Sequence, residues 1–130
     1  MTTPNPLADH LKNYLIPIFE RKAKSIIAID VRRLTSYTDC LIIIEATSQR
    51  QVTSIAEHIL KRLKEEKTSA IGTEGVKEGE WALLDYGDVI IHVFESEIKA
   101  YYNLEGLWAD APQIDISGFE TKPEEDNYED

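Results

Sequence analysis

Two short runs of almost continuous apolar residues constrain the fold more than any other feature of the chain. The run "SIIAIDV" spans residues 25–31, and "DCLIIIEAT" spans residues 39–47. Such runs are typical of strands covered on both faces, because a half-exposed strand would alternate polar and apolar residues. The polar segment between them, "RRLTSYT", is expected to connect the two strands. The chain is therefore expected to form an α/β domain around these central strands.

Helical spacing of apolar residues flanks these two runs. Residues 7–22 predict a helix, and Pro17 predicts that this helix is kinked or ends just before the proline. A second helix is predicted over residues 48–67, where Ser48 and Gln51 form a capping-box pattern. Its buried stripe is expected to consist of Val52, Ile55, Ala56, Ile59 and Leu63.

The second half of the chain adds three strands and one helix to this pattern. Residues 68–75 predict a weak edge strand, and residues 81–94 predict a hairpin that turns at Gly87. Ser96 is expected to cap a last helix rich in aromatic residues. The whole order predicts a mixed sheet of about five strands with helices packed on it.

The ends of the chain and its lone cysteine define the expected domain and compartment. We expect a flexible leader over residues 1–6, one domain over residues 7–117, and a disordered acidic tail over residues 118–130. Cys40 cannot form an intramolecular disulfide, and its apolar surroundings predict a buried, inert thiol. With no secretory signal and no apolar stretch of about 18 residues, a cytoplasmic location is expected.

The net charge of −10 restricts the classes of partner. Residues 120–130 carry six acidic residues against Lys122, so half of this charge lies outside the expected domain core. The remaining chain is still acidic, and a general binder of nucleic-acid backbones needs clustered Lys and Arg. His58 and the basic pair Lys61–Arg62 are interpreted as solvated residues. We expect this chain to bind a basic protein, and we expect no broad binding of nucleic acid.

The hairpin "WALLDYGDVIIHVF" contains the residues that most resemble a catalytic site. Asp85 and Asp88 flank the expected turn, and a metal or acid–base site could use them together with His92. However, aspartate is also a favoured turn residue, and His92 lies about 13 Å along the strand from Asp88. A turn beside a structural or interface histidine is therefore the preferred interpretation.

A nucleotide-using enzyme is the second chemical alternative, since a mixed sheet of this order can carry one. The helix opening "ATSQRQ" lacks a phosphate-binding glycine, and the acids in D-Y-G-D would not share a strand face. The chain also lacks a Walker loop, a dinucleotide fingerprint and a zinc motif. We therefore expect no catalytic residue, no cofactor and no bound metal.

Aromatic residues are concentrated toward the C-terminus. Tryptophan and tyrosine are enriched at binding hot spots, where a rigid ring offers a large contact area and a polar edge. Such exposed rings would also allow a homodimer. The residues concerned are Trp81, Tyr86, Tyr101, Tyr102 and Trp108, all within 28 positions.

Three segments together resemble the ribosomal silencing factor family, also called RsfS or Iojap. They are the hairpin "WALLDYGDVIIHVF", the following "YYNLEGLW", and "SYTDCLIIIEATSQRQ" in the first half. The resemblance covers about residues 8–111. It implies a nucleotidyltransferase-like fold without transferase activity. It also implies binding to the fourteenth protein of the large ribosomal subunit at the intersubunit face, which blocks subunit joining and represses translation when nutrients are scarce.

The resemblance also implies a set of partner-binding residues and leaves alternatives for the function. Many relatives carry arginine before the paired tyrosines, where this chain has Lys99, so a bidentate contact would be lost. Organellar relatives act in assembly of the large subunit, so an assembly factor is the first alternative and a nucleotide-using enzyme the second. The expected contacts are Trp81, Asp85, Tyr86, Asp88, His92, Tyr101, Tyr102, Leu104 and Trp108.

Overall fold

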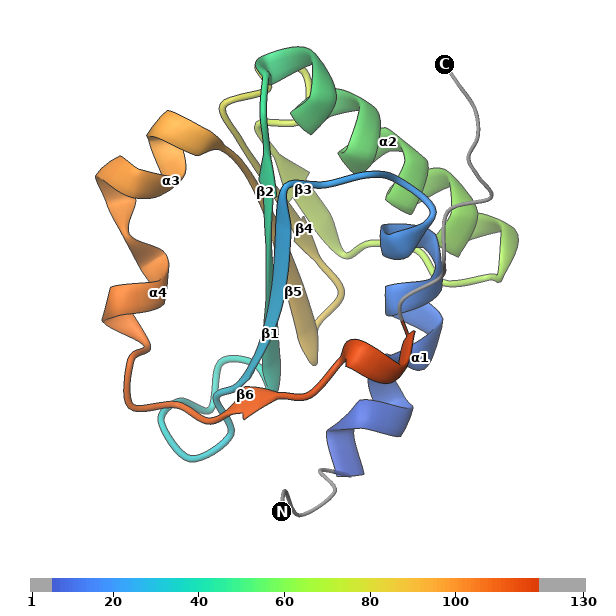
Figure 1. Ribbon diagram of the computed structural model, residues 1–130. Coiled ribbons are helices and arrows are strands. Elements are labelled where there is room, and N and C mark those ends of the chain that lie inside the picture. Colours follow the sequence, from blue (N-terminus) through green and yellow to red (C-terminus); the bar gives the residue numbers. More distant parts are fainter. Residues whose placement is uncertain (1–5, 120–130) are drawn as a thin grey trace.

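The computed structural model describes residues 6–119, and the expected order of helices and strands is confirmed within them (Figure 1). The leader and the tail lie outside the described residues, apart from Pro6, Gly118 and Phe119, which belong to α1 and η1. The elements are α1 (Pro6–Phe19), β1 (Ser25–Asp30), β2 (Cys40–Ala46), α2 (Gln49–Glu65), β3 (Gly72–Glu74), β4 (Trp81–Asp85), β5 (Val89–Glu95), α3 (Ser96–Tyr102), α4 (Leu104–Leu107), β6 (Gln113–Ile114) and the 3₁₀ turn η1 (Ser117–Phe119).

One mixed sheet organises the domain, with strands in the order β3-β4-β5-β2-β1-β6. β2 and β5 are parallel, and the other neighbouring strands are antiparallel. The sheet has one strand more than the predicted set of about five. This sixth strand, β6, forms because Gln113 and Ile114 pair with Ile29 and Ala28 of β1. Figure 1 shows α1 and α2 on one face of the sheet and α3 and α4 on the other.

The central strands carry most of the burial, as the apolar runs predict. All residues of β2 except Glu45 are buried, and β5 is buried from Val89 to Phe94. The main core lies between the sheet and the helices α1 and α2. Cys40 is fully buried, as its apolar surroundings predict, and this burial raises the pKa of its thiol to about 12.

The helix α2 shows how closely local sequence defines local structure. The stripe of Val52, Ile55, Ala56, Ile59 and Leu63 is buried, as its spacing predicts. The Ser48 hydroxyl accepts a hydrogen bond from the Gln51 amide at 3.1 Å, which is half of the predicted capping box. The other half differs, since the Gln51 side chain accepts from the amide of Thr47 at 2.7 Å instead of from Ser48.

Three local predictions about the other helices need correction. α1 does not end before Pro17 but continues to Phe19, and the alternative of a kink at Pro17 stays a prediction. The bond lost at the proline would go to the carbonyl of Asn13, an exposed residue. Glu95, and not Ser96, caps α3, and the Ser96 hydroxyl donates to the carbonyl of Ala46 instead. The last helix is also divided into α3 and α4 by Asn103, which adopts a left-handed conformation with φ of 48°.

Among the described residues, no helix is long and apolar enough to cross a membrane.

The turn between β4 and β5 depends on Gly87, as the sequence predicts. Gly87 has a φ of 88°, which residues with a Cβ rarely adopt. Replacement of Gly87 by alanine is expected to reduce the free energy of unfolding by about 1–2 kcal/mol, mainly through this backbone strain. Urea denaturation measures the loss. Gly72→Ala is the matched control, because a Cβ at Gly72 meets no atom within 4 Å and its φ is not positive; equal losses in both variants would contradict the expectation.

Candidate protein-binding face

Strand alternation in β4 divides the residues of the hairpin between the two faces of the sheet. Trp81, Leu83 and Asp85 are half-buried, whereas Ala82 and Leu84 are fully buried in the main core. In the pairing with β5, Trp81 lies opposite Phe94 and Leu83 lies opposite His92. Because residues opposite each other share a face, these four side chains lie on the side of α3 and α4.

Aromatic side chains meet on this side of the sheet, and we call Trp81, His92, Phe94, Tyr101 and Tyr102 the aromatic cluster. The Trp81 ring lies 4.7 Å from Phe94, 4.8 Å from Tyr102 and 5.8 Å from His92, measured between ring centroids. The indole N–H of Trp81 donates a hydrogen bond to Nδ1 of His92 at 2.9 Å. The ring of Trp81 is thus held in one orientation by contacts on several sides.

His92 supports this arrangement as a neutral imidazole. Its side chain is buried, and desolvation lowers the pKa of the imidazole to about 4. The acceptor role of Nδ1 places the single ring proton of the neutral form on Nε2. His92 therefore positions Trp81 and keeps this role at neutral pH.

The helix α3 presents two tyrosines at the surface beside Trp81. The Glu95 carboxylate accepts hydrogen bonds from the amides of Glu97 and Ile98 at 3.1 and 3.2 Å, and this cap fixes the start of the helix. At its other end Tyr101 is 80% exposed and Tyr102 is 53% exposed. Large rings with this exposure are available to a partner.

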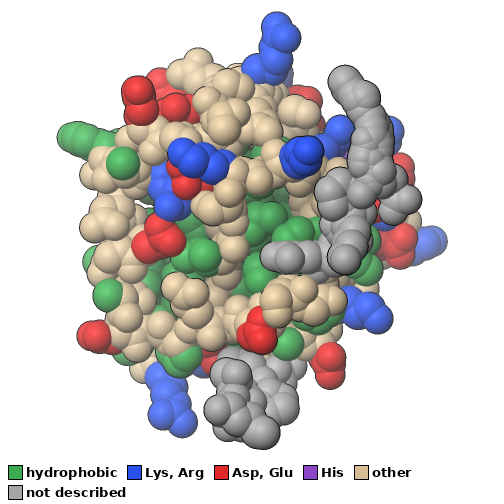
Figure 2. Space-filling view, viewed as in Figure 1, with side chains coloured by type: hydrophobic (Ala, Val, Ile, Leu, Met, Phe, Trp, Pro, Cys, Tyr) green, Lys and Arg blue, Asp and Glu red, His purple; other side chains and the backbone are tan. Residues whose placement is uncertain are grey.

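The helix α4 continues the same side with apolar residues. Leu104 and Trp108 are half-buried against a second apolar cluster on the sheet, so each contributes to packing as well as to the surface. Leu107 is 72% exposed, although it is not one of the expected contacts. Figure 2 shows hydrophobic side chains at the surface between this segment and the edge of the sheet.

The two aspartates at the turn have separate structural roles. Asp85 accepts a hydrogen bond from the amide of Gly87 at 2.8 Å, which confirms the predicted turn-forming role. Asp88 pairs with His10 of α1 at 2.6 Å. Within residues 6–119, no group of three or more His, Cys, Asp or Glu side chains is arranged to hold a metal ion. The acids of the hairpin therefore hold the turn and its contact with α1.

Tyr86 lies on the opposite side of the sheet from the aromatic cluster. Its ring is buried in the main core, 5.4 Å from the ring of Tyr14, and burial raises its pKa to about 12. The five-residue separation from Trp81 places the two residues on opposite faces. Of the nine expected contacts, seven lie on the side of α3 and α4, namely Trp81, Asp85, His92, Tyr101, Tyr102, Leu104 and Trp108.

Acidic residues outnumber basic ones in the segments that carry and flank the aromatic cluster. The segment from Glu95 to Asp110 contains four acidic residues against Lys99, and β3, β4 and the turn between them contain four against Lys77. Lys99 is bound to Glu105 and lies 3.7 Å from Glu45, so its charge is already paired within the domain. The cluster thus combines exposed rings with acidic flanking segments, which we call its negative rim.

Comparison with known proteins identifies the family. The family described as "Ribosomal silencing factor during starvation" matches residues 5–130. The ribosomal silencing factor RsfS of Halalkalibacterium halodurans is 35% identical over 99 residues, which cover 76% of this chain and 85% of that protein. The chloroplastic protein Iojap of Zea mays is 35% identical over 97 residues, covering 75% of this chain and 42% of Iojap.

A solved structure has the same fold. The crystal structure of a Chromobacterium violaceum protein superposes with a TM-score of 0.75 at 34% identity, covering 81% of this chain and 88% of that one. The hairpin motif and the paired tyrosines thus lie in an α/β fold that this solved structure shares. The chain belongs to the ribosomal silencing factor family, whose members regulate the ribosome and are not enzymes.

Proposed function

We propose that this chain binds the large ribosomal subunit through the aromatic cluster and thereby prevents the small subunit from joining. The observation that carries the proposal is the set of exposed rings around Trp81, framed by acidic residues. The names of the relatives assign ribosome silencing to those proteins, and this chain shares their family. In protein interfaces most of the binding energy comes from aromatic anchors that are surrounded by polar residues. The aromatic cluster has such rings, and acidic segments flank it.

The proposed partner on the subunit is a basic protein, the fourteenth of the large-subunit series. A negative rim favours a positive protein surface and repels exposed RNA phosphates. The charge is therefore suited to selecting a protein on a particle that consists largely of RNA.

We infer a reducing compartment such as the cytoplasm, where the buried Cys40 thiol remains reduced.

Purified ribosomal subunits provide the direct test of this function. The chain is expected to sediment with large subunits and not with small subunits, at low and at moderate salt. When it is added before the subunits are mixed, the fraction of joined ribosomes should fall in proportion to its occupancy. Sedimentation with neither subunit would overturn the proposal. Binding to large subunits with unchanged joining would favour the assembly role instead.

A homodimer through the same rings remains a prediction. Tyr101 and Leu107 are among the most exposed large side chains of the described residues, and both lie on the side of α3 and α4. A dimer formed there would compete with the ribosomal partner for the aromatic cluster. Light scattering of the chain alone and in the presence of large subunits distinguishes the two uses.

A further inference from the structure

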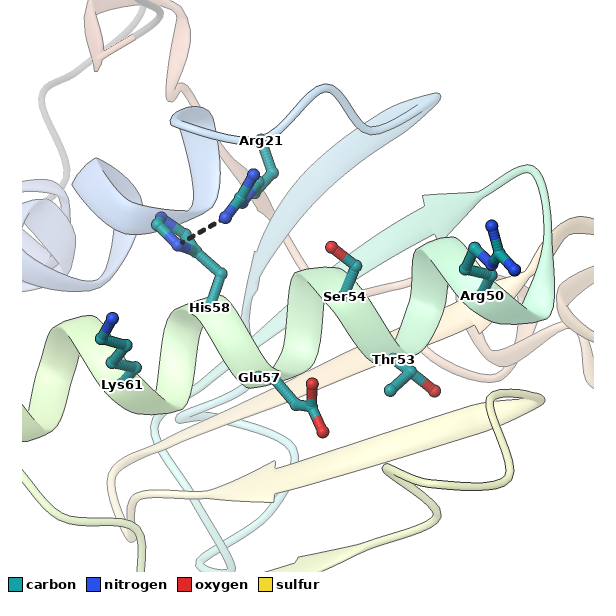
Figure 3. Close-up of a pocket in the computed structure, with 7 residues that line it drawn as sticks. All are labelled: Arg21, Arg50, Thr53, Ser54, Glu57, His58 and Lys61. Atoms are coloured by element: carbon teal, nitrogen blue, oxygen red, sulfur yellow. Dashed lines mark hydrogen bonds between the residues drawn. The ribbon is translucent and has the colours of Figure 1, made fainter.

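A row of cationic and polar side chains lies on the outer side of α2, on the opposite face of the sheet from the aromatic cluster. Arg50, Ser54, His58 and Lys61 follow one another at steps of four, four and three residues, so they share one helical face. At 1.5 Å per residue the row extends for about 16 Å. Figure 3 shows these four side chains on one side of α2, with Arg21 facing them from the segment after α1. We call these five residues the α2 row.

Three cations of the α2 row have no carboxylate partner within the described residues. No ion pair of Arg21, Arg50 or Lys61 occurs among residues 6–119. The same helix shows the contrast, because Arg62 is paired with Glu20 at 3.0 Å and with Glu65 at 3.6 Å. In a chain of net charge −10, three cations along one side of α2 that have no carboxylate partner among residues 6–119 form a distinct positive surface.

The nearby carboxylates are directed away from the α2 row or are already bound. Glu57 points to the other side of the helix in Figure 3. Glu20 binds Arg62 through both carboxylate oxygens and accepts from Nε2 of His58 at 2.8 Å. His58 in turn accepts a hydrogen bond at Nδ1 from the Arg21 guanidinium at 3.2 Å. This chain of bonds holds the Arg21 guanidinium beside α2, where no carboxylate of residues 6–119 pairs with it.

We propose that the α2 row binds the phosphate backbone of a single RNA strand. Arginine and lysine are the side chains that contact phosphates, and the Ser54 hydroxyl is an exposed donor between them. The row is shallow and extended, so it fits successive phosphates of a linear polyanion better than one small anion, which needs converging donors.

This surface goes beyond the proposed docking to a ribosomal protein. The aromatic cluster and the α2 row lie on opposite faces of the sheet, so both can be occupied at the same time. A chain docked through the aromatic cluster then presents a phosphate-binding surface on its outward side. The acidity of the rest of the chain confines RNA binding to this row and makes it weak and strongly dependent on salt.

Fluorescence anisotropy with a labelled oligouridylate of about 12 nucleotides tests the proposal without any ribosome present. Binding is expected at low salt, with a slope of log affinity against log salt of about −2, since three cations displace counterions from a single strand. The double variant Arg50→Glu/Lys61→Glu should bind at least about tenfold more weakly, with a slope reduced to about −0.7. Both residues lie on the solvent side of α2, and the milder Arg50→Gln/Lys61→Gln variant should show the same direction.

The matched control has the same change in net charge at other exposed positions. Lys12→Glu/Arg33→Glu alters α1 and the segment after β1, and its RNA affinity should stay within about twofold of the unchanged chain. Equal weakening in the control and in the α2 variant would overturn the proposal, as would no RNA binding at low salt. Tighter binding of a polyglutamate peptide, or a thermal shift by tripolyphosphate without RNA binding, would assign the row to another polyanion and also overturn it. Failure here leaves the co-sedimentation test of the aromatic cluster unaffected.

Discussion

Replacement of Trp81 by alanine is expected to weaken binding to the large ribosomal subunit by at least about 30-fold, which corresponds to about 2 kcal/mol. Trp81 is the centre of the aromatic cluster, since its ring contacts His92, Phe94 and Tyr102. Its truncation removes a half-buried anchor and also leaves Nδ1 of His92 without its donor. Sedimentation of the variant with purified large subunits at several concentrations measures the loss of affinity.

Two further variants separate lost contact from lost folding. Tyr102→Ala removes a ring that is 53% exposed, so it should weaken binding with little change in the melting temperature. Tyr37→Ala removes a ring that is 73% exposed in the segment between β1 and β2, and it should leave binding unchanged. Circular dichroism checks that each variant is folded. A folded Trp81→Ala chain that binds as well as the unchanged chain would contradict the assignment of the aromatic cluster as the docking site.

The elements defined by local sequence were predictable. The stripe of α2 follows from the spacing of its apolar residues, because a helix buries one face at a period of 3.6 residues. The apolar runs in β1 and β2 indicated central strands, since only such strands have both faces covered. The turn at Gly87 followed from the need for a positive φ between two strands.

Elements that depend on distant partners were not predictable from the same patterns. β6 consists of Gln113 and Ile114, and it exists because β1 offers an unpaired edge more than 80 residues earlier in the chain. The division of the last helix at Asn103 was also missed. Asparagine tolerates the left-handed conformation, and here its side chain accepts a hydrogen bond from the amide of Gly106.

The candidate site was predictable in composition but only partly in geometry. The hairpin motif predicted both Trp81 and Tyr86 as contacts, although strand alternation places them on opposite faces of the sheet. The same alternation could have added Leu83 and Phe94, which lie two positions from Trp81 and His92. The place of Arg21 in the α2 row was not predictable, because Arg21 and His58 lie 37 residues apart in the chain and only the fold brings them into contact.

His92 is expected to make the stability of the domain depend on pH. Its folded-state pKa of about 4 lies below the ordinary value of 6.5, so protonation favours the unfolded state. The stabilisation is complete above about pH 6.5 and is lost as the pH falls toward 4. This difference in pKa lowers the free energy of unfolding by about 3 kcal/mol at pH 4 relative to pH 7. Urea denaturation between pH 7 and pH 4 measures the loss.

The variant His92→Gln isolates this effect from other acid-sensitive groups. Glutamine does not titrate, and its amide oxygen keeps an acceptor for the Trp81 indole. Glu20 and Glu45 also lose stabilising bonds in acid, because hydrogen bonds with Arg62 and Ser96, respectively, lower their pKa values, but these groups are present in both proteins. The unchanged chain should therefore lose about 3 kcal/mol more than the variant between pH 7 and pH 4. Equal losses would contradict a buried neutral His92, and with it the hydrogen bond that orients Trp81 toward its partner.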